Sequence, residues 1–379
     1  FFENKIKLLA IITPNPDTPA ETFVRQHIRL ISPKKTVVVY FEGDGLSVKN
    51  IPSLKINRNF KKFSFEKLYN LIFWGYSGVI DKKNELNIIN FFCEHKVSSV
   101  FAEFGPTGCL ISKICKKLNL KLVVNFHGHD ATVMGKRYLI RRAYRFLNSN
   151  VNTVVCGSMH FKKIVASVGI SSEKIKVVPC GIELESFKND QKKNSNLIIG
   201  VGRFVEKKAP HLTIKAFDIV QKKIPEAKLE LIGGGKLYDN CKELIKNLYL
   251  EEKITLHGVK THKFVKERLS VASIFVQHSI TAKNGDTESQ GVSLLEAMAS
   301  KLPVVTTDHN GFKETVINET TGYLVEENDY KEMAKKIIYL LLNKNKLKTM
   351  GENGYRYAKS NYESRKIAER LNKIIFEEG

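Results

Sequence analysis

Residues 196–217 read NLIIGVGRFVEKKAPHLTIKAF and decide the fold that we expect. The apolar run 197–201 has the length of a buried strand, and a helix is expected to begin close to Lys207 and Lys208. An apolar strand followed by a helix is the repeating unit of parallel sheets that helices cover on both faces. This stretch therefore predicts an α/β domain around it.

The same alternation of apolar runs and amphipathic stretches extends outward in both directions. In the second half the expected strands are NLIIGVG, KLELIGGG, KITLHG, SIFVQHS, KLPVVTT and GYLV. In the first half they are KIKLLAIIT, KTVVVYF, SSVFAEF, KLVVNFH and NTVVCGS. We therefore predict an α/β protein with two Rossmann-like, doubly wound domains.

The boundary between these domains is expected near residues 187–196, FKNDQKKNSN, which are polar and have no periodicity. We predict domains at 1–188 and 189–360, followed by an amphipathic C-terminal helix within 361–379. Two such domains would face each other across a cleft. Because open α/β sheets bind ligands beyond the carboxyl ends of their strands, the residues that follow each strand are the candidates for chemistry.

Composition narrows the classes of protein. The 379 residues are 42% hydrophobic, which is typical of a globular chain, and no apolar run approaches the roughly 18 residues of a membrane span. Six cysteines without CxxC spacing favour free thiols in the cytoplasm. The net charge of +22 favours nucleic acid, a membrane surface or phosphorylated substrates as partners, although a general abundance of lysine would also produce it. Nucleic acid is not expected, because no RRM, KH or helix-turn-helix signature is present.

Three cations follow the strand at 197–201. Arg203 directly follows the strand end, and Lys207 and Lys208 lie where the next helix begins. Fixed cations near a helix N-terminus bind anions, because the helix dipole and free N–H groups add to their charge. An ordinary solvated basic turn would contain the same residue types, so this is a candidate anion site.

Two glutamates flank the expected start of another helix within TESQGVSLLEAMAS, residues 287–300. Glu288 precedes the helix and Glu296 lies two turns inside it, while Ser289, Gln290 and Gly291 offer backbone N–H groups between them. Carboxylates on either side of an anion site suit a ligand with hydroxyls at both ends and phosphates in the middle, such as a nucleotide sugar. Taken singly, each glutamate is equally compatible with a capping or solvent-facing role.

A histidine pair follows the strand KLVVNF in the sequence HGHD. His127, His129 and Asp130 stand at this strand end, yet no further cluster with metal-ligand spacing supports a metal site. The sequence also contains no DxD, the pattern that would hold a divalent cation on a diphosphate. Arg203 and Lys208 are expected to supply the neutralising charge instead.

Two segments mix basic and aromatic residues. These are NFKKFSFEKLYNLIFWGY at 59–76 and GKRYLIRRAYRF at 135–146. Both would suit anionic lipid headgroups, but helices packed on a sheet would show the same composition.

Taken together, these motifs resemble those of the retaining GT-B glycosyltransferases of family 4, in the exopolysaccharide and lipopolysaccharide branch. In the second half the matching pieces are VGRFVEKKAPHLTIKAF, ESQGVSLLEAMASKLPVVTT, HNGFKETV and TGYLV. In the first half they are PAETFVRQHIRLI, NFHGHD and KIKVVPCGIELESF. The resemblance covers nearly the whole chain. It implies a GT-B fold whose C-terminal helix crosses back to the first domain.

The resemblance implies a role for each matched residue on the donor side. Arg203 and Lys208 would bind the diphosphate of a UDP- or GDP-sugar, Glu288 the transferred sugar and Glu296 the ribose. His127 would stand beside the reacting centre. The backbone and side chains of the helix start would contact phosphate and sugar, and a segment after KITLH would face the base: Ser289, Gln290, Gly291, Val292, Ser293, Gly258 and Val259.

The first domain would serve the acceptor, with Asn15, Glu21, His129 and Asp130 on that side. Its loop TPNPDTPAET departs from the glycine-rich loop of the wider family, and ESQG, with Gln290 as its third residue, stands where members often have ESFG or EGxP. Asn310, Gly311, Phe312, Lys313 and Glu314 replace the common GGIPE. The implied reaction is a same-face attack that needs no metal or other cofactor. The leaving diphosphate helps to take the acceptor proton, and the cations stabilise the developing charge.

We therefore expect a glycosyltransferase that is peripheral on the cytoplasmic face of the plasma membrane and acts on a lipid-linked or oligosaccharide acceptor. A GT-B enzyme with a small soluble acceptor is the alternative. A nucleotide-sugar or nucleic-acid binding protein without turnover is less favoured, because Arg203, Lys208, Glu288 and Glu296 are all present. A Rossmann dehydrogenase is weaker still, since no GxGxxG follows the first strand of either half.

Overall fold

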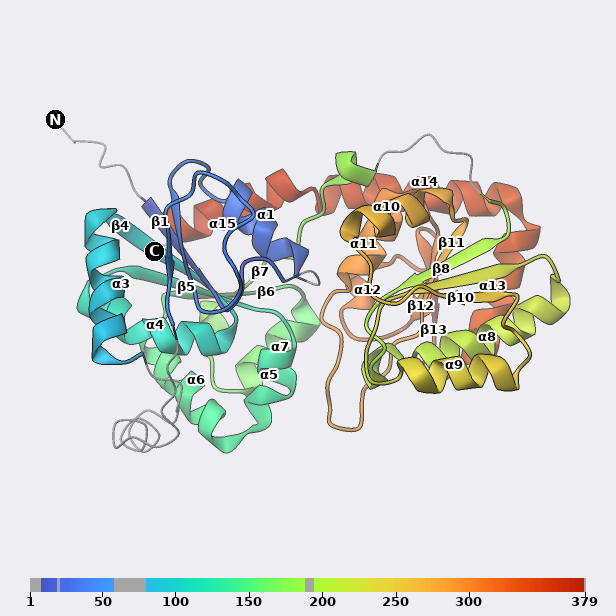
Figure 1. Ribbon diagram of the computed structural model, residues 1–379, viewed down its shortest axis with the longest axis horizontal. Helices are drawn as coiled ribbons and strands as arrows, with labels where there is room; N and C mark the ends of the chain where they lie inside the picture. Colours follow the sequence, from blue (N-terminus) through green and yellow to red (C-terminus); the bar gives the residue numbers. More distant parts are fainter. Residues whose placement is uncertain (1–7, 19–20, 58–79, 188–193, 378–379) are drawn as a thin grey trace. The chain divides into compact units, whose positions relative to one another are not determined.

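The computed structural model describes residues 8–18, 21–57, 80–187 and 194–377 (Figure 1). The chain forms two compact units, Phe1–Gly181 together with Ser364–Gly379, and Ile182–Glu363. The first division lies before the predicted 188/189, and the second lies just after 360/361. The membrane-contact segment predicted at 59–76 lies outside the described residues.

The first unit contains a sheet with the strand order β3-β2-β1-β4-β5-β6-β7, in which every neighbouring pair is parallel. Its strands are β1 Leu8–Thr13, β2 Thr36–Tyr40, β3 Ser53–Lys55, β4 Val97–Glu103, β5 Lys121–Phe126, β6 Thr153–Cys156 and β7 Ile175–Val177. Its helices are α1 Thr22–Leu30, α3 Lys82–Glu94, α4 Gly105–Lys117, α5 His129–Thr132, α6 Tyr138–Asn150, α7 Met159–Ser167 and α15 Ser364–Phe376.

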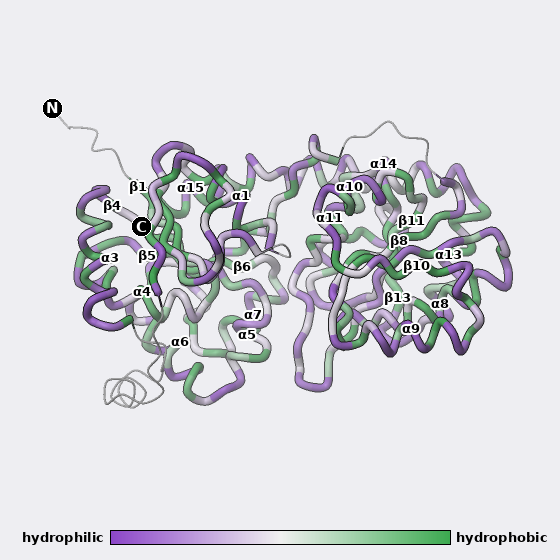
Figure 2. The backbone as a smooth tube through the Cα atoms, viewed as in Figure 1, coloured by the Kyte–Doolittle hydropathy of each residue, from purple (hydrophilic) through white to green (hydrophobic). Residues whose placement is uncertain are grey.

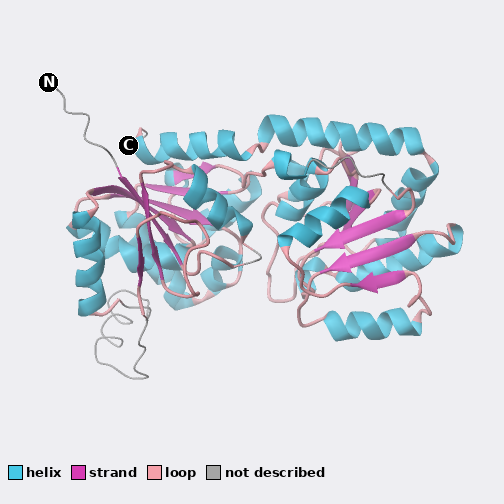
Figure 3. Cartoon of the chain, turned by 45° about the horizontal axis from the view of Figure 1, so that its top comes forward, coloured by secondary structure: helices cyan, strands magenta, loops and turns pink. Residues whose placement is uncertain are grey.

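The second unit contains a parallel sheet with the order β10-β9-β8-β11-β12-β13. Its strands are β8 Leu197–Val201, β9 Lys228–Ile232, β10 Ile254–Leu256, β11 Ile274–Gln277, β12 Val304–Thr307 and β13 Gly322–Val325. Its helices are α8 Pro210–Lys223, α9 Tyr238–Asn247, α10 His262–Val271, α11 Val292–Ala299, α12 Phe312–Thr315, α13 Tyr330–Leu342 and α14 Lys344–Asn361. The predicted pair of Rossmann-like α/β domains is confirmed, and Figure 3 shows helices on both sides of this sheet.

Each sheet is buried on both faces, which explains its continuous apolar strands. In β1, Ala10 and Ile12 join one hydrophobic cluster while Leu9 and Ile11 join another on the opposite face. Figure 2 shows the strands largely in the colour of hydrophobic residues, whereas many helices alternate between the two colours. The face that carries Leu9 and Ile11 is covered by α1 and by α15, so the C-terminal helix belongs to the first unit.

The order of the second sheet determines where its ligand site can lie. β8 is flanked by β9 on one side and by β11 on the other, so the chain direction across the sheet reverses between β8 and β11. Loops that follow two such strands diverge and leave a crevice at their carboxyl ends. Arg203 and Lys208 follow β8, and Glu288 lies in the segment after β11, so the topology brings these segments together.

The GGG after β9 allows a close approach of backbones beside this crevice. Gly233 has φ +143°, and a Cβ there would lie 1.9 Å from the carbonyl oxygen of Gly202. The Gly233 N–H donates to the carbonyl of Gly258 at 2.9 Å, and the Phe204 N–H donates to Gly234 at 2.8 Å. The segments that follow β8, β9 and β10 therefore meet through glycines.

None of the helices within the described ranges is both long enough and apolar enough to cross a lipid bilayer.

Candidate functional site

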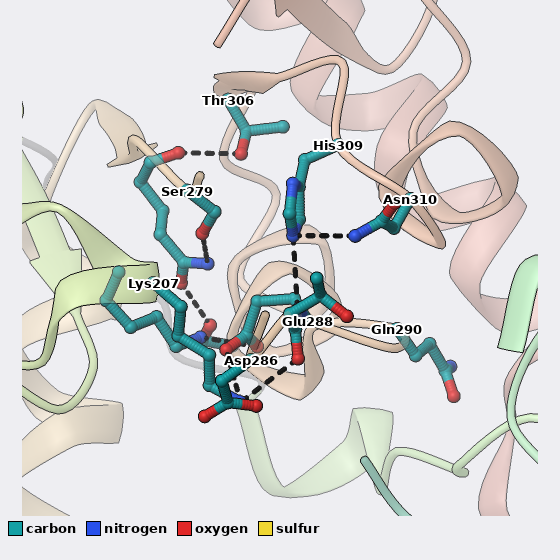
Figure 4. A network of polar contacts seen from close by, with 12 residues as sticks. Lys207, Ser279, Asp286, Glu288, Gln290, Thr306, His309 and Asn310 are labelled. Atoms are coloured by element: carbon teal, nitrogen blue, oxygen red, sulfur yellow. Dashed lines mark hydrogen bonds and ion pairs between the residues drawn. The ribbon is translucent and has the colours of Figure 1, made fainter. Parts of the chain in front are cut away.

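An ion-pair cluster lies where the segments after β8 and β11 meet (Figure 4). Lys208 Nζ lies 2.9 Å from Glu288 Oε2, and Lys207 Nζ lies 3.4 Å from Glu288 Oε1. Lys207 also contacts Asp286 Oδ1 at 3.1 Å and donates to the carbonyl of Thr287 at 3.1 Å. Lys207 therefore ties the loop before α11 to the segment after β8, while Lys208 pairs with Glu288.

The electrostatics keep Glu288 ionised. Burial raises its pKa, but Lys208 and Lys207 outweigh that effect and lower it to about 2. Burial lowers the pKa of Lys208; Glu288 raises it, and the positive charges of Lys207 and Arg203 lower it again. Because the carboxylate is charged, Glu288 can accept hydrogen bonds from a ligand but cannot donate a proton to one.

Arg203 is exposed, and it lies close enough to Lys208 to lower the pKa of that lysine. Among the residues that the structure describes, no carboxylate pairs with Arg203. The cluster thus has one more cation than Glu288 and Asp286 neutralise. A planar guanidinium beside an ammonium matches the geometry and charge of a phosphate group.

Glu296 lies on α11 and is buried, and its Oε1 is 3.0 Å from Nε2 of His262 at the start of α10. The sequence predicted Glu296 but not His262, since no local pattern joins residues 34 positions apart. Ser293 donates its hydroxyl to Gln277 Oε1 at 2.8 Å, and the Gln277 amide donates to Ser279 Oγ at 3.0 Å. This chain of contacts fixes the first turn of α11 against the end of β11.

Several of the predicted donor-binding residues lie at the start of α11 and in the segment after β10. α11 begins at Val292, with Gly291 before it at φ +79°. A Cβ at Gly291 would lie 2.3 Å from Leu294 and 2.6 Å from the Phe312 ring, so packing requires this glycine. Gln290 is buried, and its backbone carbonyl accepts the Thr315 hydroxyl at 3.0 Å. Val259, next to Gly258, is 75% exposed, so its apolar side chain is accessible to a ligand.

In the first unit, His127 belongs to a buried polar cluster at the carboxyl ends of β4 and β5. Glu103, which is fully buried, contacts His127 Nε2 at 2.7 Å and His27 Nδ1 at 2.6 Å, and accepts from Asn125 Nδ2 at 3.1 Å. Phe23 stacks on the His127 ring with centroids 4.1 Å apart. Sequence reasoning missed Glu103 and His27, although a charged residue ending a buried strand is the signal that identified Arg203.

The residues of this cluster carry opposite charges, negative on Glu103 and positive on His127. Burial raises the pKa of Glu103, but His27 and His127 lower it to about 2. Burial lowers the pKa of His127, but the hydrogen bonds that its ring makes to Cys180 and Glu103 raise it to about 10. His127 is therefore an imidazolium at neutral pH, a hydrogen-bond donor rather than a base.

The residues predicted on the acceptor side have different surroundings. Asp130 is buried, and its carboxylate accepts the backbone N–H groups of Gly105, His127, Gly128 and Ala131, so it holds the HGHD turn in place. His129, the first residue of α5, is exposed. The side chain of Asn15 accepts the Asp17 N–H at 3.0 Å, and Glu21 is the N-cap residue of α1. Their proposed contacts with an acceptor stay predictions.

Within the described part of the chain, no group of three or more His, Cys, Asp or Glu side chains is arranged to hold a metal ion.

Comparisons with known families match both units. Residues 181–357 match the model of glycosyl transferases group 1, and residues 94–186 match that of glycosyltransferase family 4. The chain is 32% identical to the amylovoran biosynthesis glycosyltransferase AmsK of Erwinia amylovora, over 62% of this chain and 60% of the relative. It is 31% identical to the putative colanic acid biosynthesis glycosyltransferase WcaL of Salmonella typhimurium, over 64% and 61%.

These matches span about three fifths of the length of each relative. Among solved structures, Anabaena HepE in complex with UDP superimposes with a TM-score of 0.79 at 17% identity, over 97% of this chain and 99% of HepE. At that identity the similarity establishes the shared fold alone. The two family models and the curated relatives show that this chain belongs to the GT-B glycosyltransferases of family 4.

Proposed function

We propose that the protein moves a sugar from a nucleotide diphosphate sugar to a lipid-linked or growing surface-glycan acceptor at the cytoplasmic face of the membrane. The transfer retains the anomeric configuration and needs no metal. The observation that carries this proposal is the Lys208–Glu288 pair at 2.9 Å beside Arg203, for which no carboxylate partner is described. The names of AmsK and WcaL, which both refer to the synthesis of a polysaccharide, support the acceptor class.

In this mechanism Arg203 and Lys208 bind the diphosphate and stabilise the charge that develops as it leaves. Glu288 is already ionised, with a pKa of about 2, so it accepts hydrogen bonds from hydroxyls of the transferred sugar. Glu296, held by His262, accepts hydrogen bonds from the ribose hydroxyls. These cations supply the charge that a divalent metal supplies in other transferases, which is why we propose a metal-independent reaction.

Retention follows if the acceptor attacks on the face from which the diphosphate departs. The new glycosidic bond forms as the bond to the diphosphate oxygen breaks, and that oxygen takes the proton of the acceptor hydroxyl. An imidazolium at His127 supports this route, because a group with a pKa of about 10 is a poor proton acceptor at neutral pH. His127 would then donate a hydrogen bond to an oxygen of the substrate.

For membrane contact, α6 is the described element that supports the proposal. Its inner face packs into the core through Ile140, Tyr144 and Leu147. Its outer face is basic, with Tyr138 72% exposed, and includes Lys136, Arg137, Arg141, Arg142 and Arg145 on and just before the helix. Such a surface attracts anionic headgroups by about 1 kcal/mol per cation. Binding to phosphatidylglycerol vesicles in a flotation assay, lost in Arg141→Ala/Arg142→Ala, is the expected result, and no flotation would favour a small soluble acceptor.

A donor screen tests the central claim. We expect the melting temperature to rise with one of a panel of UDP- and GDP-sugars, and this rise to disappear in Lys208→Ala and in Glu296→Ala. Glu288→Ala is expected to fold but to lose transfer by about 10²–10³-fold, since it removes a directed contact in the active site. Transfer in the presence of EDTA and the anomeric signal of the product test metal independence and retention. A protein that no nucleotide sugar stabilises would contradict the proposal.

A further inference from the structure

His309 follows β12 and is completely buried. Its Nε2 faces the backbone N–H of Glu288 at 3.1 Å and the side-chain amide of Asn310 at 3.0 Å (Figure 4). Its Nδ1 lies 2.5 Å from Glu327 Oε1, in the segment after β13. His309 therefore connects the loop that carries Glu288 to the far edge of the same sheet.

These contacts determine the tautomer of His309. A backbone N–H can only donate, so Nε2 must carry a lone pair where it meets Glu288. A carboxylate can only accept, so Nδ1 must carry the proton where it meets Glu327. The ring is thus neutral, with the proton on Nδ1. A proton on Nε2 would set two donors against each other in a buried site.

Glu327 serves as the anchor of this arrangement. Its Oε2 accepts the backbone N–H of Thr281 at 2.9 Å, and Thr281 lies in the same loop as Glu288. The next residue, Asn328, donates its backbone N–H to Nε2 of His278 at 2.9 Å. The loop after β11 is thereby held near its start by the segment that follows β13, and near Glu288 by His309, which Glu327 orients.

We propose that His309 and Glu327 are positioning residues for Glu288. The imidazole fixes the backbone of Glu288, and Glu327 fixes both the tautomer of that imidazole and the opposite end of the loop. Glu288 then meets Lys208 in the geometry that the reaction requires. This role deepens the proposed function and rests on it. The two residues act through Glu288 and are not assigned a contact with substrate.

The first test examines the tautomer and does not need a substrate. In protein with ¹⁵N-labelled histidine, the NMR resonances of His309, assigned by comparison with His309→Gln, should show a protonated Nδ1 and a bare Nε2. An Nε2–H tautomer or an imidazolium in the folded protein would overturn the proposal, whether or not the protein proves to be a glycosyltransferase.

The second test compares variants kinetically, using the nucleotide sugar that the donor screen selects. His309→Leu removes the hydrogen bonds to Glu288, Asn310 and Glu327, and we expect kcat to fall on the order of 10²-fold, the loss typical of a reacting group displaced by about 1 Å. Affinity for UDP or GDP, measured by calorimetry, should change little because Arg203, Lys208 and Glu296 remain. His309→Gln keeps an acceptor where Nε2 stood and should recover much of kcat. Glu327→Gln should be milder than Glu327→Ala.

The control is His95→Leu, the same substitution at the C-terminal end of α3 in the first unit. It should leave kcat unchanged. Equal kcat in His309→Leu and wild type, or equal loss in His309→Leu and His309→Gln, would overturn the positioning role. If the wild type neither binds nor turns over any nucleotide sugar, the proposed function fails, and the NMR result still decides the placement of His309.

Discussion

At the residue scale, pairs of a histidine and a carboxylate recur at the candidate sites of this protein. His27 and His127 share Glu103, His262 contacts Glu296, and His309 contacts Glu327. In each pair the carboxylate lies within hydrogen-bond distance of a ring nitrogen and so orients the ring. These partners hold in position the residues that are proposed to face a ligand.

The Glu103 cluster gives a prediction about pH. The folded-state pKa of His127 is about 10, above its usual 6.5, so the pairing stabilises the fold fully below 6.5 and loses its contribution as the pH rises through 10. The pKa of Glu103 is about 2, below its usual 4.5, so its contribution is present above 4.5 and is lost as the pH falls through 2. Glu103→Gln removes the negative charge of this side chain, and with it both of these pH-dependent contributions to stability.

We expect Glu103→Gln to lower the pKa of His127, measured by NMR titration of its ring. The free energy of unfolding should fall by about 3–5 kcal/mol, because a buried charge pair loses one partner. Urea unfolding of the variant should also depend less on pH between 6.5 and 10. The matched control is Glu85→Gln on the surface, where the pair with Lys117 at 3.6 Å should contribute at most about 1 kcal/mol. An unchanged pKa of His127 would contradict this account.

Single residues also show which parts of the candidate sites can be predicted from the sequence and which cannot. Arg203, Lys208 and Glu288 were predicted because each stands beside a strand end or helix start, and a local pattern marks such positions. His27 and Glu103 are 76 positions apart, and His262 and Glu296 are 34 apart. Only the folded sheet brings these partners together, so no spacing in the sequence points to them.

At the scale of elements, every expected strand has a counterpart, whereas β3 and β7 were not predicted. Both have three residues and lie at the edges of the first sheet, and β3 is largely exposed. An edge strand buries less apolar surface, so it lacks the continuous hydrophobic run that reveals a central strand. The segment 135–146 was expected either to face lipid or to pack on the sheet, and α6 has a packed face together with an exposed basic one.

The meeting of the segments after β8 and β9 gives a prediction about Gly233. Gly233→Ala would place a Cβ 1.9 Å from the Gly202 carbonyl, so the two backbones must separate next to Arg203. The control is Gly45→Ala, which has a similar φ of +147° but no atom within 4 Å of the added Cβ. We expect Gly233→Ala to lower the free energy of unfolding by about 1–3 kcal/mol more than the control does, the cost of overpacking. If chemical denaturation gave the same loss of unfolding free energy for both variants, the positive φ alone would determine the cost, and the contact with Gly202 would contribute nothing.

At the scale of the whole molecule, the first unit is discontinuous in the sequence. The chain completes seven strands of the first sheet, passes through the entire second unit, and returns as α15. Ile367, Leu371 and Ile375 on that helix then cover Leu9 and Ile11 of β1 together with α1. The first unit therefore reaches its full core only when the last residues of the described chain are in place.

This dependence is testable with one substitution in the full chain. Leu371 is 1% exposed, so Leu371→Ala should leave a cavity beneath α15 and cost about 2–5 kcal/mol. Because the two units have separate hydrophobic clusters, hydrogen exchange followed by mass spectrometry should show lost protection in α1, α15 and β1 but not in α11 or β11. Lys373→Ala, on the exposed side of the same helix, is the control and should change the free energy of unfolding by less than about 0.5 kcal/mol. Equal loss of protection in both units would mean that they unfold as one body, which would contradict the independence of their cores.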